Sequence, residues 1–145
     1  MPSGWVELPE WLAGPAAAVF ADIQGDDPIS NLRLLATKTG HPDGAIFSVL
    51  EPDGTGGGRS VSRHADPIEM ILEIAEILQD ECAERSGGWG QPRPPCPYHP
   101  HPARPALRGG EAWWVCERRE ERLYRIGTGE VVAAARAKNG KRIWR

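Results

Sequence analysis

The sequence has few of the features that mark secreted or membrane proteins. It contains no apolar run near the roughly 20 residues that a bilayer-spanning helix needs. Residues 1–10 carry acidic side chains and no basic segment, unlike a secretory signal. There are only 3 cysteines, and an odd number of thiols cannot all pair within one chain. We therefore expect a cytoplasmic protein with reduced cysteines and no membrane partner.

Motifs that specify a reaction are also missing. The glycine-rich residues 54–60 look like a phosphate-binding loop, but they lack the four-residue spacer and the Lys before Ser or Thr. We interpret them as a hairpin loop. Cys96 and His99 could form a nucleophile and base, yet no acidic residue is placed to orient the histidine. We therefore predict no catalytic residues.

Acidic and basic residues are unevenly distributed along the chain. Residues 1–90 contain 15 Asp and Glu against 5 Lys and Arg, a net charge of −10, whereas residues 91–145 contain 5 against 12, a net charge of +7. A basic half is typical of a nucleic-acid-binding segment. The alternative, which we favour, is that the two halves attract each other within one chain or across a homodimer.

Two segments of the first 86 residues have the spacing of apolar side chains that is typical of helices. In residues 9–24, Pro15 predicts either a kink or a helix that begins there. The second helix is amphipathic and extends from Asp66 to about residue 85. It begins with Asp66-Pro67-Ile68-Glu69, which combines an N-cap acid, Pro at the first helical position and a capping Glu. Its predicted core face consists of Ile68, Ile71, Leu72, Ala75, Leu78 and Cys82.

Between these helices the pattern predicts a three-stranded antiparallel meander. The predicted strands are residues 32–39, 45–51 and 59–63, separated by turns at residues 41–44 and 52–58. The amphipathic helix should pack across this sheet. We therefore predict an α+β fold, with an α/β domain over residues 1–86.

The remaining residues predict a small zinc-ribbon-like β-hairpin over residues 87–130 and a basic C-terminal tail over residues 131–145. Short strands are expected at residues 104–107, 112–116 and 123–126, with a Gly-Gly turn between the first two.

A metal site is predicted from the spacing of cysteine and histidine in this hairpin. Cys96, His99 and His101 occur in one proline-rich turn, and Cys116 ends a later strand. Zinc prefers four sulfur or nitrogen donors in a tetrahedron, which two such turns can supply. Arg119 occupies the position of a second ligand in the second turn, so the fourth donor is His101, Glu117, Glu120 or solvent, and we favour His101. The alternative is that both cysteines are plain buried thiols and the histidines cap turns.

Two adjacent tryptophans indicate a binding surface. Trp113 and Trp114 should face opposite sides of one strand, so that one covers the core or metal site and the other is either packed or exposed for recognition. Arginines surround them in the sequence, and Arg and Trp are both common at interfaces. The residues expected to form this surface are Trp113, Trp114, Arg104, Arg108, Arg118 and Arg122.

Three short motifs follow one another within residues 89–127: the Pro-Pro-Cys-Pro-x-His-Pro turn at residues 94–100, Trp114-Val115-Cys116 and Arg125-Ile126-Gly127. Through these motifs the segment resembles a family of small uncharacterised actinobacterial proteins. The resemblance implies a short α/β domain followed by a degenerate zinc-ribbon-like hairpin, and it implies no activity. In that family Pro follows the second cysteine, whereas here Glu117 does.

Together these features predict a protein-interaction module with a structural metal-binding hairpin, whose partner is another protein or a second copy of the chain. One alternative is a nucleic-acid-binding accessory protein that uses the basic C-terminal half. An enzyme is the least favoured alternative.

Overall fold

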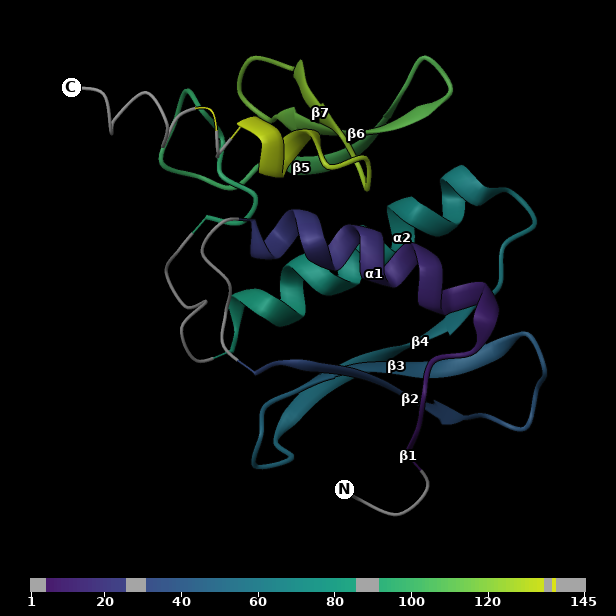
Figure 1. Ribbon diagram of the computed structural model, residues 1–145. Helices are drawn as coiled ribbons and strands as arrows, with labels where there is room; N and C mark the ends of the chain where they lie inside the picture. The colour runs from purple at the N-terminus through teal and green to yellow at the C-terminus, as the bar shows by residue number, and fades with distance from the viewer. Residues whose placement is uncertain (1–4, 26–30, 86–91, 135–136, 138–145) are drawn as a thin grey trace.

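Two antiparallel sheets enclose a pair of helices, so the chain forms three layers (Figure 1). The structure is a computed structural model that describes residues 5–25, 31–85, 92–134 and 137. Its elements are β1 (Trp5–Val6), α1 (Glu10–Gln24), β2 (Arg33–Lys38), β3 (Gly44–Leu50), β4 (Gly56–Ser62), α2 (Pro67–Ala83), β5 (Arg104–Arg108), β6 (Glu111–Cys116) and β7 (Glu121–Arg125). In the described part of the chain, neither helix has the length and apolar character needed to cross a membrane.

The N-terminal sheet has the strand order β1-β2-β3-β4. Its last three strands confirm the predicted meander, and the two-residue β1 adds a fourth strand that is too short to leave a sequence pattern. The prediction that residues 56–58 belong to a loop was wrong, because these glycines pair with β3 inside β4. The pairing requires glycine at position 58, since a Cβ there would lie 2.1 Å from the backbone oxygen of Phe47 and 2.7 Å from Cα of Ser48 on β3.

Both helices lie where the sequence predicts them. Helix α1 begins directly after Pro9 and includes Pro15 within its length. At the start of α2, Oδ1 of Asp66 accepts a hydrogen bond of 2.9 Å from the amide of Ile68, which confirms the predicted N-cap.

The buried face of α2 differs from the prediction. The sequence pattern placed Ile68, Ile71 and Leu72 in the core, but these side chains are only half-buried. Helix α2 contacts α1 and strands of both sheets, so its buried stripe is wider than one amphipathic face. The buried residues of α2 are Met70, Ile74, Ala75, Ile77, Leu78, Gln79, Glu81 and Cys82.

The C-terminal sheet, with the order β5-β6-β7, covers the helices on the side opposite the N-terminal sheet (Figure 1). It contributes Ala112 and Trp114 to the same apolar cluster that contains Phe47 and Leu78. The predicted hairpin is therefore a three-stranded sheet built onto the shared core. Of the predicted tail, residues 131–134 and 137 are helical, and the others lie outside the described residues.

Candidate metal centre

A closed loop before β5 brings Cys96 and His101 side by side. Pro95 pairs with Pro102 in an isolated antiparallel bridge, and the amide of Cys96 donates a hydrogen bond of 3.2 Å to the carbonyl of His101. Proline supplies no amide hydrogen, so a loop this rich in proline depends on its few remaining donors. The peptide bond between Arg93 and Pro94 is cis.

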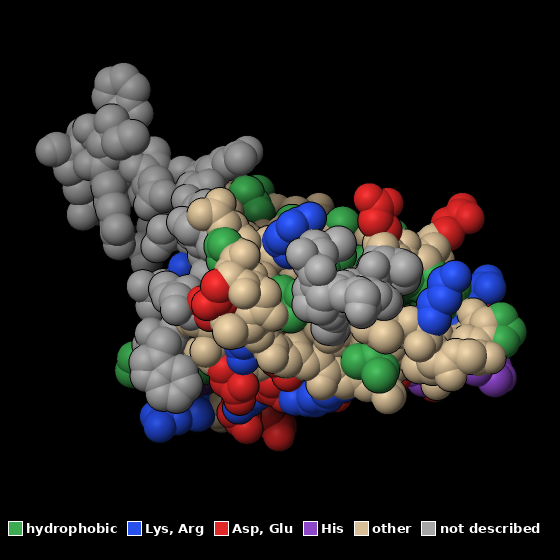
Figure 2. Space-filling view, turned by 90° about the horizontal axis from the view of Figure 1, so that it is seen from below, with side chains coloured by type: hydrophobic (Ala, Val, Ile, Leu, Met, Phe, Trp, Pro, Cys, Tyr) green, Lys and Arg blue, Asp and Glu red, His purple; other side chains and the backbone are tan. Residues whose placement is uncertain are grey.

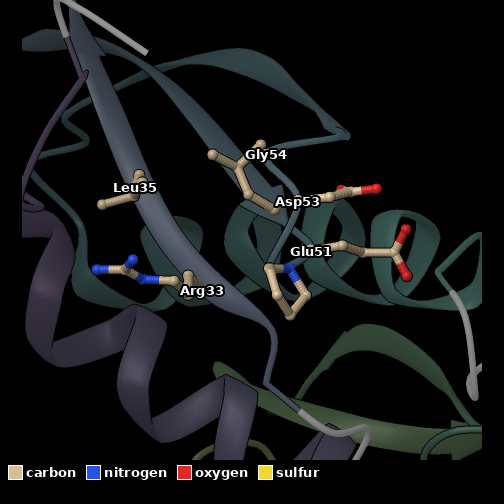
Figure 3. A pocket seen from close by; sticks show the side chains of 7 residues that line it. Arg33, Leu35, Glu51, Asp53 and Gly54 are labelled. Atoms are coloured by element: carbon tan, nitrogen blue, oxygen red, sulfur yellow. The ribbon is translucent and has the colours of Figure 1, made fainter. Parts of the chain in front are cut away.

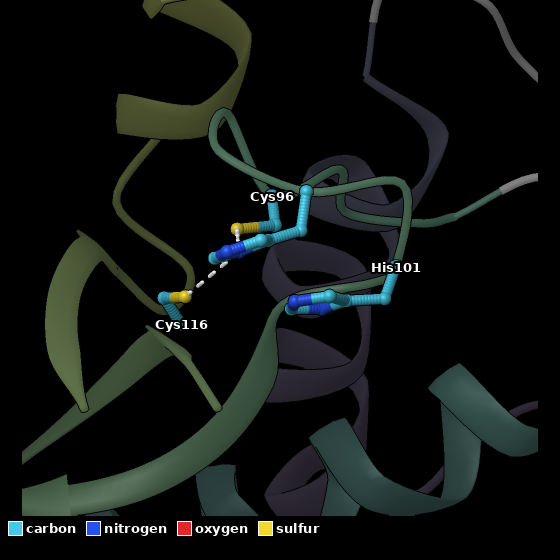
Figure 4. Close-up of side chains that lie close together, drawn as sticks. Cys96, His101 and Cys116 are labelled. Atoms are coloured by element: carbon cyan, nitrogen blue, oxygen red, sulfur yellow. Dashed lines mark hydrogen bonds between the residues drawn. The ribbon is translucent and has the colours of Figure 1, made fainter. Parts of the chain in front are cut away.

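The end of β6 completes a cluster of four possible ligands (Figure 4). Nδ1 of His99 lies 3.4 Å from Sγ of Cys116 and 3.8 Å from Sγ of Cys96. One ligand atom from each of Cys96, His99, His101 and Cys116 lies within 4.8 Å of the other three. Donors around one tetrahedral zinc ion are separated by about 3.3–3.8 Å, so contraction of about 1 Å would close the cluster on an ion. The predicted residues thus form a cluster that could hold a metal ion.

The surroundings of Cys116 and His99 favour the ionisation states that bind metals. Burial raises the pKa of the Cys116 thiol, but hydrogen bonds from the amides of Arg119 and Arg118 and with Cys96 outweigh it, so the pKa lies below its ordinary value. Burial also lowers the pKa of His99, with further lowering from the charges of His101 and the two arginines. Metals bind the thiolate and the neutral imidazole, which these shifts favour. All three cysteines of the chain are free thiols.

The hydrogen bonding of His101 leaves one ring nitrogen without a partner. Nδ1 lies 3.0 Å from the carbonyl oxygen of Pro102, and because a carbonyl only accepts, Nδ1 carries the proton. Nε2 is then an acceptor, and it is buried without a hydrogen-bond partner. A ligating histidine typically donates its other N–H to a carbonyl in this way. His101 therefore fits the requirements of a ligand, and its ring stacks on His99 at 4.9 Å between centroids.

Arg119 occupies the position at which a zinc ribbon would have a second ligand in its second turn. Here its side chain packs on Tyr98 of the first turn. Its guanidinium lies 4.1 Å from the centre of the Tyr98 ring, and the Tyr98 hydroxyl donates a hydrogen bond of 3.2 Å to Glu121. These contacts join the two turns that carry the candidate ligands. Glu117 pairs with Arg104 at 3.8 Å instead of joining the cluster, and Glu120 is not part of the cluster either.

A buried glutamine that sequence reasoning missed holds the base of the loop. Nε2 of Gln79 on α2 donates to the carbonyls of Arg93, at 3.0 Å, and Ala103, at 2.5 Å. These two residues flank the loop that carries three of the ligands. Arg93 in turn donates to the carbonyls of Ile23 and Gln24 at the end of α1. One indication of this role was present in the sequence: Gln79 is a polar residue that directly follows Leu78 in the apolar stripe of the helix.

The residues predicted to form a binding surface divide into two groups. Trp114 is fully buried, so its assignment to a surface was wrong. It faces the helices, where its indole N–H donates a hydrogen bond to Asp22 of α1. The other tryptophan, Trp113, is half-buried on that outer side, while Arg104, Arg108, Arg118 and Arg122 are exposed.

A hollow lies on the N-terminal sheet beside the turn that follows β3 (Figure 3). It has a volume of about 320 Å³ and includes Arg33, Leu35 and Asp53 in its lining. Asp53 accepts hydrogen bonds from the amide and hydroxyl of Thr55, at 2.9 and 2.6 Å, so its carboxylate serves the turn. On the face seen from below, hydrophobic, acidic and basic side chains are interspersed (Figure 2).

Comparison with models of protein families, with curated proteins and with solved structures found no match to this chain. The functional evidence is therefore the geometry of the cluster formed by Cys96, His99, His101 and Cys116.

Proposed function

We propose that the chain is a zinc-binding protein whose ion is held by Cys96, His99, His101 and Cys116. The observation that carries this proposal is the convergence of two sulfur and two imidazole donors within 4.8 Å. The buried, unpartnered Nε2 of His101 supports it further. Mg²⁺ and Ca²⁺ prefer oxygen ligands, whereas two thiolates with two imidazoles are typical of zinc.

The role of this zinc is structural. Catalytic zinc keeps a coordination position open for water or substrate, and four protein donors leave none. An ion at this site would join the loop before β5 to the end of β6, which otherwise meet through few hydrogen bonds. The enzyme alternative therefore receives no support from the site.

Elemental analysis of the purified full-length chain tests the proposal. We expect one zinc ion per chain and a large loss of zinc in the Cys96→Ser and His101→Gln variants. Cys82→Ala is the matched control, because Cys82 is a buried thiol of α2 outside the cluster, with burial raising its pKa to about 12. Wild-type protein without zinc, or equal loss of zinc in the Cys82 variant, would contradict the proposal.

We further propose that the zinc-supported sheet serves as a protein-interaction module. The support is the outer side of the C-terminal sheet, where exposed arginines surround the half-buried Trp113. A nucleic-acid-binding role predicts salt-dependent retention of the chain on DNA or RNA, because neutralised phosphates release counterions. Failure to bind either nucleic acid at low ionic strength would remove that alternative.

A further inference from the structure

The register of the C-terminal sheet gathers arginines on its outer side. Along β6, Trp114 and Cys116 are fully buried, and the regular pairing with β5 places Trp113 and Val115 on the other side of the strand, while the pairing with β7 shifts register between Trp114 and Val115. Trp113 pairs with Arg125, while Val115 lies between Arg104 and Arg122 on the neighbouring strands. We name the outward residues Arg104, Arg108, Trp113, Arg122 and Arg125 the arginine face.

Two arginines of the arginine face, Arg122 and Arg125, lie over the ring of Trp113. The guanidinium carbon of Arg122 lies 5.1 Å, and that of Arg125 5.6 Å, from the centre of the Trp113 ring. Val115 lies on the outer side and is not a member of the main core cluster. Its side chain is nevertheless only 4% exposed. The aliphatic stems of neighbouring arginines can cover such a side chain while their charges stay in water.

The charges of this face are only partly neutralised. Arg125 pairs with Glu111, and Arg104 pairs with Glu117 at 3.8 Å. Arg122 has no carboxylate partner within the described part of the chain, and Arg108 donates only to the neighbouring carbonyl of Leu107. The face therefore has cationic groups available for an anionic partner.

We propose that the arginine face binds an acidic segment of a protein partner. This inference rests on the proposed role as an interaction module and names the chemistry of its partner. A guanidinium held in one plane can bind a carboxylate through two parallel hydrogen bonds with little further loss of freedom. Arg and Trp are also the residues that contribute most binding energy at protein interfaces.

Two observations favour a protein over a nucleic acid. The guanidiniums of Arg122 and Arg125 cover the Trp113 ring, on which a base would otherwise stack. The carboxylates of Glu111 and Glu117 interrupt the arginines, whereas single-stranded nucleic acids typically bind in grooves that are positively charged along the backbone. An acidic segment needs only a few matched carboxylates.

Fluorescence anisotropy with the full-length, zinc-loaded chain tests this proposal. The probe is a labelled peptide of alternating Glu and Ser, and a Gln-Ser peptide of the same length is the uncharged control. We expect the acidic peptide to bind, with affinity falling about tenfold in Arg122→Gln, since this change removes charge-assisted hydrogen bonds to a carboxylate of the peptide. Arg108→Gln should also weaken binding. Arg33→Gln, on the N-terminal sheet, should not, because Arg33 is exposed on a different layer.

Three results would overturn the proposal. The first is no binding of the acidic peptide, or equal losses in the Arg122 and Arg33 variants. The second is tighter binding of single-stranded DNA of matched charge, which would indicate a nucleic acid. The third is self-association that excludes the peptide, which would indicate a second copy. Zinc content is measured on every sample, so loss of the metal and loss of the binding face are separate outcomes.

Discussion

The carboxylate of Asp22 on α1 accepts a hydrogen bond of 2.9 Å from the indole of Trp114, which lies 92 residues later in the chain. The same oxygen accepts a hydrogen bond of 2.6 Å from the amide of Gly127. A single buried side chain of the first helix thus fixes both β6 and the turn that follows β7. The C-terminal sheet, which carries Cys116 of the candidate metal cluster, is positioned by this contact.

Replacing Asp22 should therefore loosen the attachment of the C-terminal sheet. Asp22→Leu leaves two buried N–H donors without an acceptor, and we expect the free energy of unfolding to fall by about 2–5 kcal/mol. Asp22→Asn keeps an acceptor oxygen and should cost about 1 kcal/mol. Urea unfolding of the two variants measures the difference. Equal losses in both would mean that side-chain volume, and not the hydrogen bonds, matters at this position.

The same carboxylate should make stability depend on pH. Burial raises the pKa of Asp22 above its ordinary value of 3.8, and the hydrogen bonds from Gly127 and Trp114 offset only part of this effect. The folded state therefore binds the proton more tightly than the unfolded chain does. The resulting stabilisation is fully present below the unfolded pKa and is lost as pH rises through the folded pKa.

Asp22→Asn does not titrate and isolates this effect. As pH rises from about 4 to about 7, wild-type protein should lose stability relative to the Asn variant. Urea unfolding of both proteins across this range provides the comparison. A difference that stays constant with pH would show that Asp22 has the same pKa in both states.

The N-cap of α2 should contribute to stability as caps of other helices do. Asp66→Ala removes the hydrogen bond to the amide of Ile68, and we expect the free energy of unfolding to fall by about 1 kcal/mol. Asp66→Asn retains an acceptor and is the matched control. An unchanged denaturant midpoint for the Ala variant would contradict a role for this cap.

Local spacing was enough to predict the four residues of the metal cluster and the start of α2. Cys96 and His99 lie in one short turn. Asp66 is the N-cap of α2, and Pro67 is its first residue. These relationships depend on residues close in the sequence, and Cys116 was predicted from its place at the end of the strand that follows the Gly-Gly turn.

Relationships between layers could not be predicted in this way. Alternation along β6 shows that Trp113 and Trp114 face opposite sides, but only the packing of α1 decides which is inside. Glycine is unfavourable in strands, so Gly58 in β4 is explained only once the backbone of Phe47 and Ser48 on β3 is known to leave no room for a Cβ. Each case depends on a contact between distant segments.

Removal of the proposed zinc should loosen the metal loop while α2 remains folded. Hydrogen exchange of the zinc-loaded chain, before and after treatment with a chelator, measures this. We expect faster exchange at residues 93–103 and 116–121, because the thiolate and imidazole donors would no longer be joined by an ion. Amides of α2 should remain protected, since this helix contacts both sheets and α1. Uniform loss of protection throughout the chain would indicate that the metal supports the whole fold.

Gln79 should position the metal loop as well as stabilise the fold. Gln79→Leu has a similar size but removes the hydrogen bonds to the carbonyls of Arg93 and Ala103, which flank the loop. We expect the free energy of unfolding to fall by about 2 kcal/mol and zinc affinity to fall on the order of tenfold, because the loop ends would no longer be held together. Glu76→Gln is the matched control, since Glu76 is exposed on the same helix. Competition with a chelator gives the zinc affinity, and the absorption spectrum of the cobalt-substituted protein reports ligand geometry. Lower stability with unchanged zinc affinity and an unchanged cobalt spectrum would show that Gln79 supports the core alone.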